Sequence, residues 1–215
     1  MNIIGDIAGQ WKTLQALLKQ MPDEEPISLG DMVDRGPQSK EVVDFFMKNG
    51  RALMGNHEHM MVDACRQGSF YEHGLWTNYN GGSPTLDSFG WKVPDDVLDW
   101  ASRLPKYMEV PFGEELYFLS HAPFYAGYEL PIEGCNLGSW AGHYPIVDQS
   151  LIWHRGEPID RDYTLQLFGH NAHWGIRHFS SNGFNYAMCI DSSKQKVLTG
   201  INLPSGDVYQ QPYIK

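Results

Sequence analysis

The sequence predicts an α/β fold built from β-α-β units, and two observations support this. Five short apolar runs each end in a Gly or Ser followed by a polar side chain able to bind a metal; they cover residues 2–4, 27–29, 52–54, 116–119 and 165–168. Short apolar runs bounded by turn residues are typical of buried strands. Helical patterns separate the first three runs. Because crossover helices join parallel neighbours, we expect parallel pairing of these three strands.

The first predicted helix has an apolar face formed by Trp11, Leu14, Leu17, Leu18 and Met21. The second is predicted to start near Pro37 and Ser39, and its apolar face contains Val42, Phe45 and Phe46. About 25 residues separate each polar strand end from the next along this part of the chain. Ligands of such sheets bind beyond the carboxyl ends of the strands. We therefore expect all five polar strand ends to meet in one crevice.

The remaining segments lack this regular alternation. Residues 68–110 are predicted to form a helical insertion, with a helix from Asp95 to Arg103 opened by Pro94. Residues 122–150 are rich in Gly, Pro and aromatic residues, which predicts a long ordered loop near the site. Two antiparallel strands are predicted at 185–190 and 196–203. The length of 215 residues fits a single domain over 1–215.

The composition narrows the range of partners. The chain has 26 acidic and 16 basic residues, a net charge of −10. That excess disfavours sequence-independent binding to nucleic acid or to an anionic membrane. No apolar window is long enough to span a membrane, and no signal peptide is evident. The three cysteines are far apart and form no CxxC pair, so we expect reduced thiols and a cytoplasmic location.

Five motifs follow the predicted strands in a fixed order. They are Gly5-Asp6-Ile7-Ala8-Gly9, Gly30-Asp31-Met32-Val33-Asp34-Arg35-Gly36, Gly55-Asn56-His57-Glu58, Ser120-His121-Ala122 and Gly169-His170-Asn171. As an ordered set they resemble the metallophosphoesterase superfamily and, within it, the phosphoprotein phosphatase family with its GDxHG, GDxxDRG and GNHE motifs. Three further stretches resemble the short bacterial and bacteriophage serine/threonine protein phosphatases: 80–82, 151–155 and 189–192.

The resemblance implies a calcineurin-like α/β sandwich of two mixed β-sheets flanked by helices. It also implies two divalent metal ions. Asp31 matches the bridging ligand, Asp6 matches a ligand of the first metal, and the second metal would be held by Asn56, His121 and His170. A donor set of carboxylate, amide oxygen and imidazole without thiolate suits manganese, with iron or zinc as the other candidates. Such a metal pair activates water for attack on phosphorus.

The resemblance further assigns the catalytic groups. His57 matches the general acid that protonates the leaving oxygen, and Asp34 matches the carboxylate that orients it. Arg35 and Arg155 match arginines that bind the phosphate, which Asn56 also contacts as a substrate-binding residue. The assignment of Arg155 depends on the stretch 151–155, and Arg161 and Arg177 are the alternatives. Glu58 is interpreted as a structural residue in the first turn of a helix.

Position 8 departs from the family, because Ala8 stands where the first motif has a metal-binding histidine. A methyl group cannot coordinate a metal, so the first metal site is expected to be weakened. Three explanations remain open. The residue is an engineered change that silences the enzyme, or a natural divergence towards a single-metal or inactive protein, or its role is taken over by His173 or His59. The other histidines, His73, His143, His154 and His178, are interpreted as structural or exposed.

The predicted function is hydrolysis of a phosphomonoester by metal-activated hydroxide. Phosphoserine or phosphothreonine on a protein is the preferred substrate, and the partner is therefore a phosphorylated protein or a small phosphoester. Cleavage of a dinucleoside polyphosphate is the alternative within hydrolases. A catalytically inactive phosphate-binding module is the alternative from another class, and only Ala8 supports it.

Overall fold

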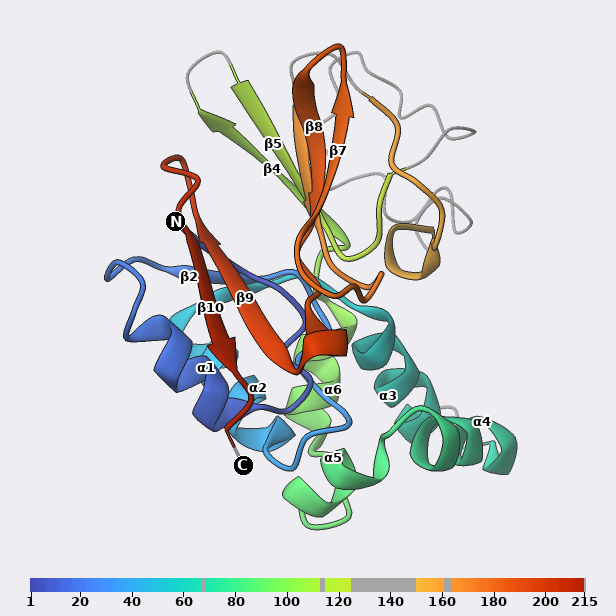
Figure 1. The fold of residues 1–215 in the computed structure, drawn as a ribbon. Coiled ribbons are helices and arrows are strands. Elements are labelled where there is room, and N and C mark those ends of the chain that lie inside the picture. Colours follow the sequence, from blue (N-terminus) through green and yellow to red (C-terminus); the bar gives the residue numbers. More distant parts are fainter. Residues whose placement is uncertain (67–68, 113–114, 125–149, 161–163, 215) are drawn as a thin grey trace.

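A computed structural model describes the chain except for residues 67–68, 113–114, 125–149, 161–163 and 215 (Figure 1). It contains two five-stranded mixed sheets, one in the order β10-β9-β1-β2-β3 and the other in the order β4-β5-β6-β8-β7. Most of the helices lie beside the first sheet. The predicted sandwich of two mixed sheets is confirmed.

The first sheet contains the three strands predicted to be parallel. β1 (Asn2–Ile4) pairs with β2 (Pro26–Ser28), and β2 pairs with β3 (Arg51–Ala52), in both cases in parallel. The crossovers are α1 (Trp11–Leu18) and α2 (Ser39–Asn49), as the apolar spacing predicts. β9 (Val197–Asn202) and β10 (Val208–Pro212) extend the sheet with antiparallel pairing.

The second sheet has three parallel strands at its centre. They are β5 (Glu115–Ser120), β6 (Thr164–Phe168) and β8 (Phe184–Cys189). β4 (Tyr107–Phe112) and β7 (Arg177–Ser181) pair antiparallel at the two edges. β5 and β6 thus end in the same direction, which brings the motifs that follow them to one edge of the sheet.

The main core lies between the two sheets. Its buried members lie in strands of both sheets or directly after them: Ile3, Ile27, Leu29, Leu53, Tyr117, Leu119, Leu167, Ile190, Ile201 and Leu203. A second cluster lies between the first sheet and its helices and includes Ile4, Ile7, Leu14, Leu17, Val42 and Phe46. Because successive strand residues face opposite sides, Ile3 and Ile4 belong to different clusters. Because β1 is packed on both faces, the loop that follows it, which carries the first motif, starts from a fixed position.

Helices form a separate layer beside the first sheet (Figure 1). They are α3 (Asn56–Arg66), α4 (Phe70–Gly74), the π-helix η1 (Leu75–Tyr79), α5 (Ser83–Ser88) and α6 (Asp95–Ser102). Their apolar faces meet in a cluster around Trp76, Met61 and Leu98. The helix predicted from Pro94 is confirmed. The upper bound of the predicted helical segment is wrong, because β4 begins at Tyr107, where the chain pairs with β5.

The two C-terminal strands lie in different sheets and do not pair with each other. β8 is antiparallel to β7, whereas β9 is antiparallel to β1 and β10. The short 3-10 helix η3 (Ser193–Gln195) lies on the connection between the sheets. Most of the loop predicted over 122–150 lies outside the described residues. Within the described ranges, no helix has the length and apolar character needed to cross a membrane.

Candidate functional site

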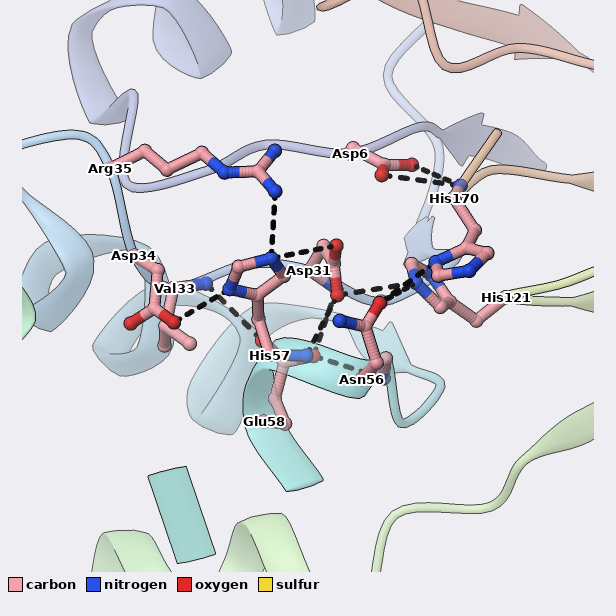
Figure 2. A network of polar contacts seen from close by, with 12 residues as sticks. Asp6, Asp31, Val33, Asp34, Arg35, Asn56, His57, Glu58, His121 and His170 are labelled. Carbon is pink, nitrogen blue, oxygen red and sulfur yellow. Dashed lines mark hydrogen bonds and ion pairs between the residues drawn. The ribbon is translucent and has the colours of Figure 1, made fainter. Parts of the chain in front are cut away.

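The five polar strand ends meet at one place, as the alternation of strands and helices predicts (Figure 2). Oδ1 of Asn56 lies 3.0 Å from Nε2 of His121 and 2.8 Å from Nδ1 of His170. Nε2 of His121 lies 3.2 Å from Oδ1 of Asp31. Ligand atoms of Asp31, His121 and His170 all fall within 4.8 Å of one another, and all three residues are buried. Atoms from both sheets thus surround a space suited to one cation.

The protonation of these groups fits a metal. Nδ1 of His121 contacts the carbonyl oxygen of Leu29 at 3.0 Å, and Nε2 of His170 contacts the carbonyl oxygen of Trp153 at 3.3 Å. A carbonyl only accepts, so those nitrogens carry the protons. The opposite nitrogens then present lone pairs to Oδ1 of Asn56, which also accepts. A cation at the centre would satisfy this cluster of acceptors.

The charges agree with that assignment. Burial lowers the pKa of His121, and burial together with the neighbouring His121 lowers the pKa of His170 to about 3. Burial opposes the ionised form of Asp31, but the imidazoles of His121 and His57 and a backbone N–H bond outweigh it and lower its pKa to about 2. At neutral pH the site therefore offers a carboxylate and two neutral imidazoles, which are the forms that bind metals.

Strained backbone aims the side chains into the site. Asp31, Asp34, Arg35 and His170 all have positive φ, between 52° and 72°. For residues other than glycine this region costs about 1–3 kcal/mol each, and such strain clusters at functional sites. The motif glycines leave the space that the carboxylates need. A Cβ on Gly55 would lie 2.3 Å from Oδ1 of Asp31.

Glu58 binds the backbone of the second motif loop, residues 31–33. Its carboxylate accepts backbone N–H bonds from Asp31 at 2.8 Å, Met32 at 2.7 Å, Val33 at 3.2 Å and Gly55 at 3.0 Å. Burial and the charge of Asp31 raise its pKa to about 7, against the effect of these bonds. Its place in the first turn of α3 predicts a structural residue, and the four backbone bonds agree with that prediction. Its bonds also hold the backbone of Asp31 in place.

His57 and Asp34 form a buried pair. Nδ1 of His57 lies 2.6 Å from Oδ2 of Asp34, and Nη2 of Arg35 lies 2.9 Å from Nε2 of His57 (Figure 2). Burial favours neutral His57, yet the charge of Asp31 and the hydrogen bond to Asp34 raise its pKa. The charge of Arg35 works in the opposite direction. The three residues predicted to be catalytic are therefore in direct contact.

The helical layer fixes the Asp34 carboxylate. Nε1 of Trp76 donates to Oδ2 at 2.9 Å, and Oγ1 of Thr85 donates to Oδ1 at 2.7 Å. The Asp34 backbone N–H donates in return to Oγ1 of Thr85 at 2.8 Å. The sequence alone identifies neither partner. The glycine pair in the Asn80-Gly81-Gly82 turn is the sequence feature that could have indicated a side chain packed against this turn. A Cβ on Gly82 would lie 2.4 Å from the Trp76 ring, so only glycine fits there.

The predicted first metal position has fewer donors around it. The Asp6 carboxylate accepts a bond from the His170 backbone N–H at 3.2 Å, and its pKa is raised by burial, Asp191 and Asp31. Ala8 is buried and offers no donor. His59 pairs with Asp63 at 3.3 Å. The backbone N–H of His173 donates to the carbonyl of Asp191. Among the described residues, neither histidine joins an ion-sized group with Asp6.

The candidate phosphate arginines differ in position. Arg35 reaches the site, as Figure 2 shows. Arg155 is exposed, and its charge contributes to the lowered pKa of His170. Arg177 pairs with Glu157 and lies over the Phe179 ring in β7. Arg161 lies outside the described residues.

This geometry agrees with a match to a known family. The calcineurin-like phosphoesterase family matches residues 2–187. The chain belongs to this family. Members of this family are hydrolases that use divalent metals, and in this chain the group of Asp31, His121 and His170 is suited to hold one.

Relatives of this phosphoesterase fall into two substrate classes. It is 28% identical to serine/threonine-protein phosphatase 2 of Escherichia coli over 188 residues, which cover 83% of each chain. It is 35% identical to the symmetrical bis(5'-nucleosyl)-tetraphosphatase of Paracidovorax citrulli over 128 residues, 55% of this chain and 42% of that protein. Among solved structures, a putative diadenosine tetraphosphatase shares the fold with a TM-score of 0.71 at 19% identity, covering 100% of this chain and 93% of the other.

Proposed function

We propose that this phosphoesterase hydrolyses phosphomonoesters and that its substrates are phosphoserine or phosphothreonine side chains of proteins. The relative that is aligned over 83% of both chains is named a serine/threonine-protein phosphatase. The nucleosyl tetraphosphatase relative is matched over only 42% of its length.

The observation that carries the proposal is the acceptor cluster beside an imidazole–carboxylate pair. Asn56, His121 and His170 direct acceptor atoms at one another, and the His57–Asp34 pair lies on the other side of Asp31 (Figure 2). Divalent cations bound there, manganese by preference, with iron or zinc as alternatives, would polarise the phosphoryl oxygens and lower the pKa of a bound water. A structural cluster would instead pair each acceptor with a donor.

The chain's own residues have distinct roles in this proposal. Arg35 turns from Nε2 of His57 to the phosphate, where a guanidinium can donate two parallel bonds. The freed Nε2, once protonated, donates its proton to the leaving oxygen. Asp34 keeps the imidazole oriented through Nδ1 and stabilises its charged form. Arg155 contacts the phosphate from the side of His170.

A second candidate function is symmetrical cleavage of a dinucleoside polyphosphate. The higher identity, 35%, to a bis(5'-nucleosyl)-tetraphosphatase favours it. Trp153, which is 40% exposed, also lies beside the site, because its backbone carbonyl contacts His170 while its ring packs edge-on against His59. An exposed indole next to a phosphate site can stack a nucleobase.

One experiment tests both the substrate preference and the effect of Ala8 on activity. The purified protein and its Ala8→His variant are assayed with Mn²⁺ on p-nitrophenyl phosphate, a phosphothreonine peptide and diadenosine tetraphosphate, with His57→Asn as the inactive control. We expect phosphopeptide hydrolysis in excess of diadenosine tetraphosphate cleavage, and a higher rate after Ala8→His. Faster release of nucleoside diphosphates would favour the second candidate. No hydrolysis by either protein, with metal bound, would favour a phosphate-binding module.

A further inference from the structure

Ser39 has a buried hydroxyl that does not cap the helix it begins. Ser39 is the first residue of α2, and the cap position before it is occupied by Gln38, which makes no side-chain cap. Serine caps a helix from that preceding position, where its oxygen accepts N–H groups of the first turn. The Ser39 oxygen instead accepts the backbone N–H of Asp34 at 3.2 Å. Its role therefore concerns Asp34 rather than the end of α2.

The same hydroxyl joins α2 to two other parts of the site. Its oxygen lies 2.9 Å from Oγ1 of Thr85 in α5. A Cβ on Gly9 would lie 3.0 Å from the same oxygen, so the hydroxyl also lies against the first motif. Ser39, Thr85 and Asp34 are all fully buried. Bulk water does not compete for these bonds, which makes them stronger than bonds at the surface.

The direction of these bonds follows from the number of protons available. Thr85 has one hydroxyl proton, and it is donated to Oδ1 of Asp34 at 2.7 Å. The contact between Ser39 and Thr85 therefore has Ser39 as the donor. The result is a hydroxyl chain that runs from Ser39 through Thr85 to Asp34. Each donor in such a chain polarises the next one and strengthens the bond that follows.

The hydroxyl chain ends on the oxygen of Asp34 that faces away from His57. Nδ1 of His57 lies 2.6 Å from Oδ2 (Figure 2), whereas Thr85 donates to Oδ1. Nε1 of Trp76 donates to both oxygens, at 3.1 and 2.9 Å, so it does not distinguish between them. The Thr85 bond does, because a carboxylate that rotated away from His57 would lose it.

We propose that Ser39 is a remote positioning residue for the His57–Asp34 pair and acts through Thr85. Ser39 orients the Thr85 hydroxyl, Thr85 holds Oδ1 of Asp34, and Oδ2 is thereby kept in line with the imidazole. Both hydroxyls are buried, so neither contacts a substrate. The proposal rests on the proposed hydrolytic function, in which His57 is the acid.

A second contact between α2 and α5 supplies the matched control. Oγ of Ser88 accepts the backbone N–H of Lys40 at 3.2 Å and donates to the carbonyl of Thr85 at 2.8 Å. Ser88→Ala thus removes a hydroxyl that joins the same two helices without touching Asp34. Its effect measures what a looser helix contact does by itself.

The first measurement separates kcat from KM, on p-nitrophenyl phosphate with Mn²⁺. Thr85→Val keeps the side-chain shape and removes the donor, so kcat is expected to fall about tenfold or more while KM changes less than about twofold. Ser39→Ala is expected to lower kcat by a smaller factor, about threefold. Thr85→Ser, which keeps the hydroxyl, and Ser88→Ala should stay close to wild type. Thr85→Val should fold, because Trp76 still donates to Oδ1 and Ser39 still accepts the Asp34 N–H.

The second measurement does not depend on turnover. The short bond between Nδ1 of His57 and Asp34 gives a proton resonance far downfield, which is recorded by NMR in the presence of diamagnetic Zn²⁺ and identified by its loss in His57→Asn. It is expected to move in Thr85→Val and, by less, in Ser39→Ala, because the charge of Asp34 shifts towards Oδ2 when the donor to Oδ1 is lost. It should stay in place in Ser88→Ala.

The outcomes separate the proposal from the function on which it rests. A resonance that stays in place in both Thr85→Val and Ser39→Ala would overturn the positioning role, and so would equal losses of kcat in Ser39→Ala and Ser88→Ala. A resonance that moves as expected in a wild-type background that hydrolyses no phosphoester would overturn the proposed function and leave the positioning of the pair intact.

Discussion

Nη2 of Arg35 donates to Nε2 of His57 at 2.9 Å, on the opposite side of the imidazole from Asp34. A guanidinium has no acceptor, so this contact shows that Nε2 carries the lone pair and Nδ1 the proton. His57 is therefore neutral in this arrangement. For His57 to act as an acid, Arg35 must leave Nε2, and a phosphate anion is a suitable alternative partner for the guanidinium. Phosphate binding and activation of the acid are thereby linked.

Asp34→Asn should move the alkaline limb of the kcat profile to lower pH. The hydrogen bond and charge of Asp34 raise the pKa of His57, so their loss lets burial lower it. The acid is then deprotonated at a pH where the wild-type acid is still charged. At pH 8 we expect kcat to fall by about 100-fold or more. Profiles from pH 5 to 9 test this, and an unshifted limb would contradict the role of Asp34.

Arg35→Ala should move the same limb in the opposite direction. The positive charge of Arg35 lowers the pKa of His57, so its removal favours the imidazolium. The same variant loses a bidentate phosphate contact, and KM should rise by about tenfold or more. Arg66→Ala, which removes an exposed pair with Asp99 far along α3, is the control. A limb that moves to lower pH would refute the assigned tautomer.

Trp76→Phe should lower kcat while changing KM little. The variant keeps most of the buried ring but removes the N–H that donates to Oδ2 of Asp34, so the carboxylate is less well oriented. A hydrogen bond to a charged group is worth about 1.5–3 kcal/mol, which corresponds to roughly 10- to 100-fold in kcat if it acts only in the transition state. Trp100→Phe, at the packing interface of two core clusters, serves as the matched control. Equal losses in both variants would indicate general destabilisation.

Glu58→Gln should destabilise the fold although the shape is conserved. The glutamine amide has one acceptor oxygen, and its NH₂ group would face backbone N–H donors that now bind Glu58. We expect a loss of about 1–3 kcal/mol in the free energy of unfolding for each donor left unpaired. Urea unfolding measures it, with the exposed Glu41→Gln in α2 as the control. A loss no larger than in Glu41→Gln would show that the four bonds contribute little.

The sequence predicts the site best where the strands themselves position it. Asp31, Asn56 and His121 follow buried strands, and strand ends at one edge of a sheet must lie close together. Trp76 and Thr85 could not be predicted, because helix packing brings them to Asp34 from 42 and 51 residues away. The contact between Ser39 and Thr85 likewise appears only when the packing is known.

Two errors in the predicted fold also arise from long-range packing: the upper bound of the helical segment and the pairing of the C-terminal strands. β4, Tyr107–Phe112, lies inside the segment predicted as helical, and it has no fully buried residue that would mark one face of a strand. It becomes a strand through its pairing with β5. The C-terminal strands were predicted correctly as elements, but local sequence does not reveal that β8 and β9 join different sheets. Long-range pairing decides both cases.

Anomalous diffraction from crystals soaked in Mn²⁺ would locate the cation that the acceptor cluster requires. We predict a strong peak within bonding distance of Oδ1 of Asn56, Nε2 of His121, Nδ1 of His170 and the Asp31 carboxylate. His121→Ala crystals treated in the same way should show a weaker peak or none. Strong Mn²⁺ peaks elsewhere with none among these four residues, in wild-type crystals, would contradict the assignment of this cluster as a metal centre.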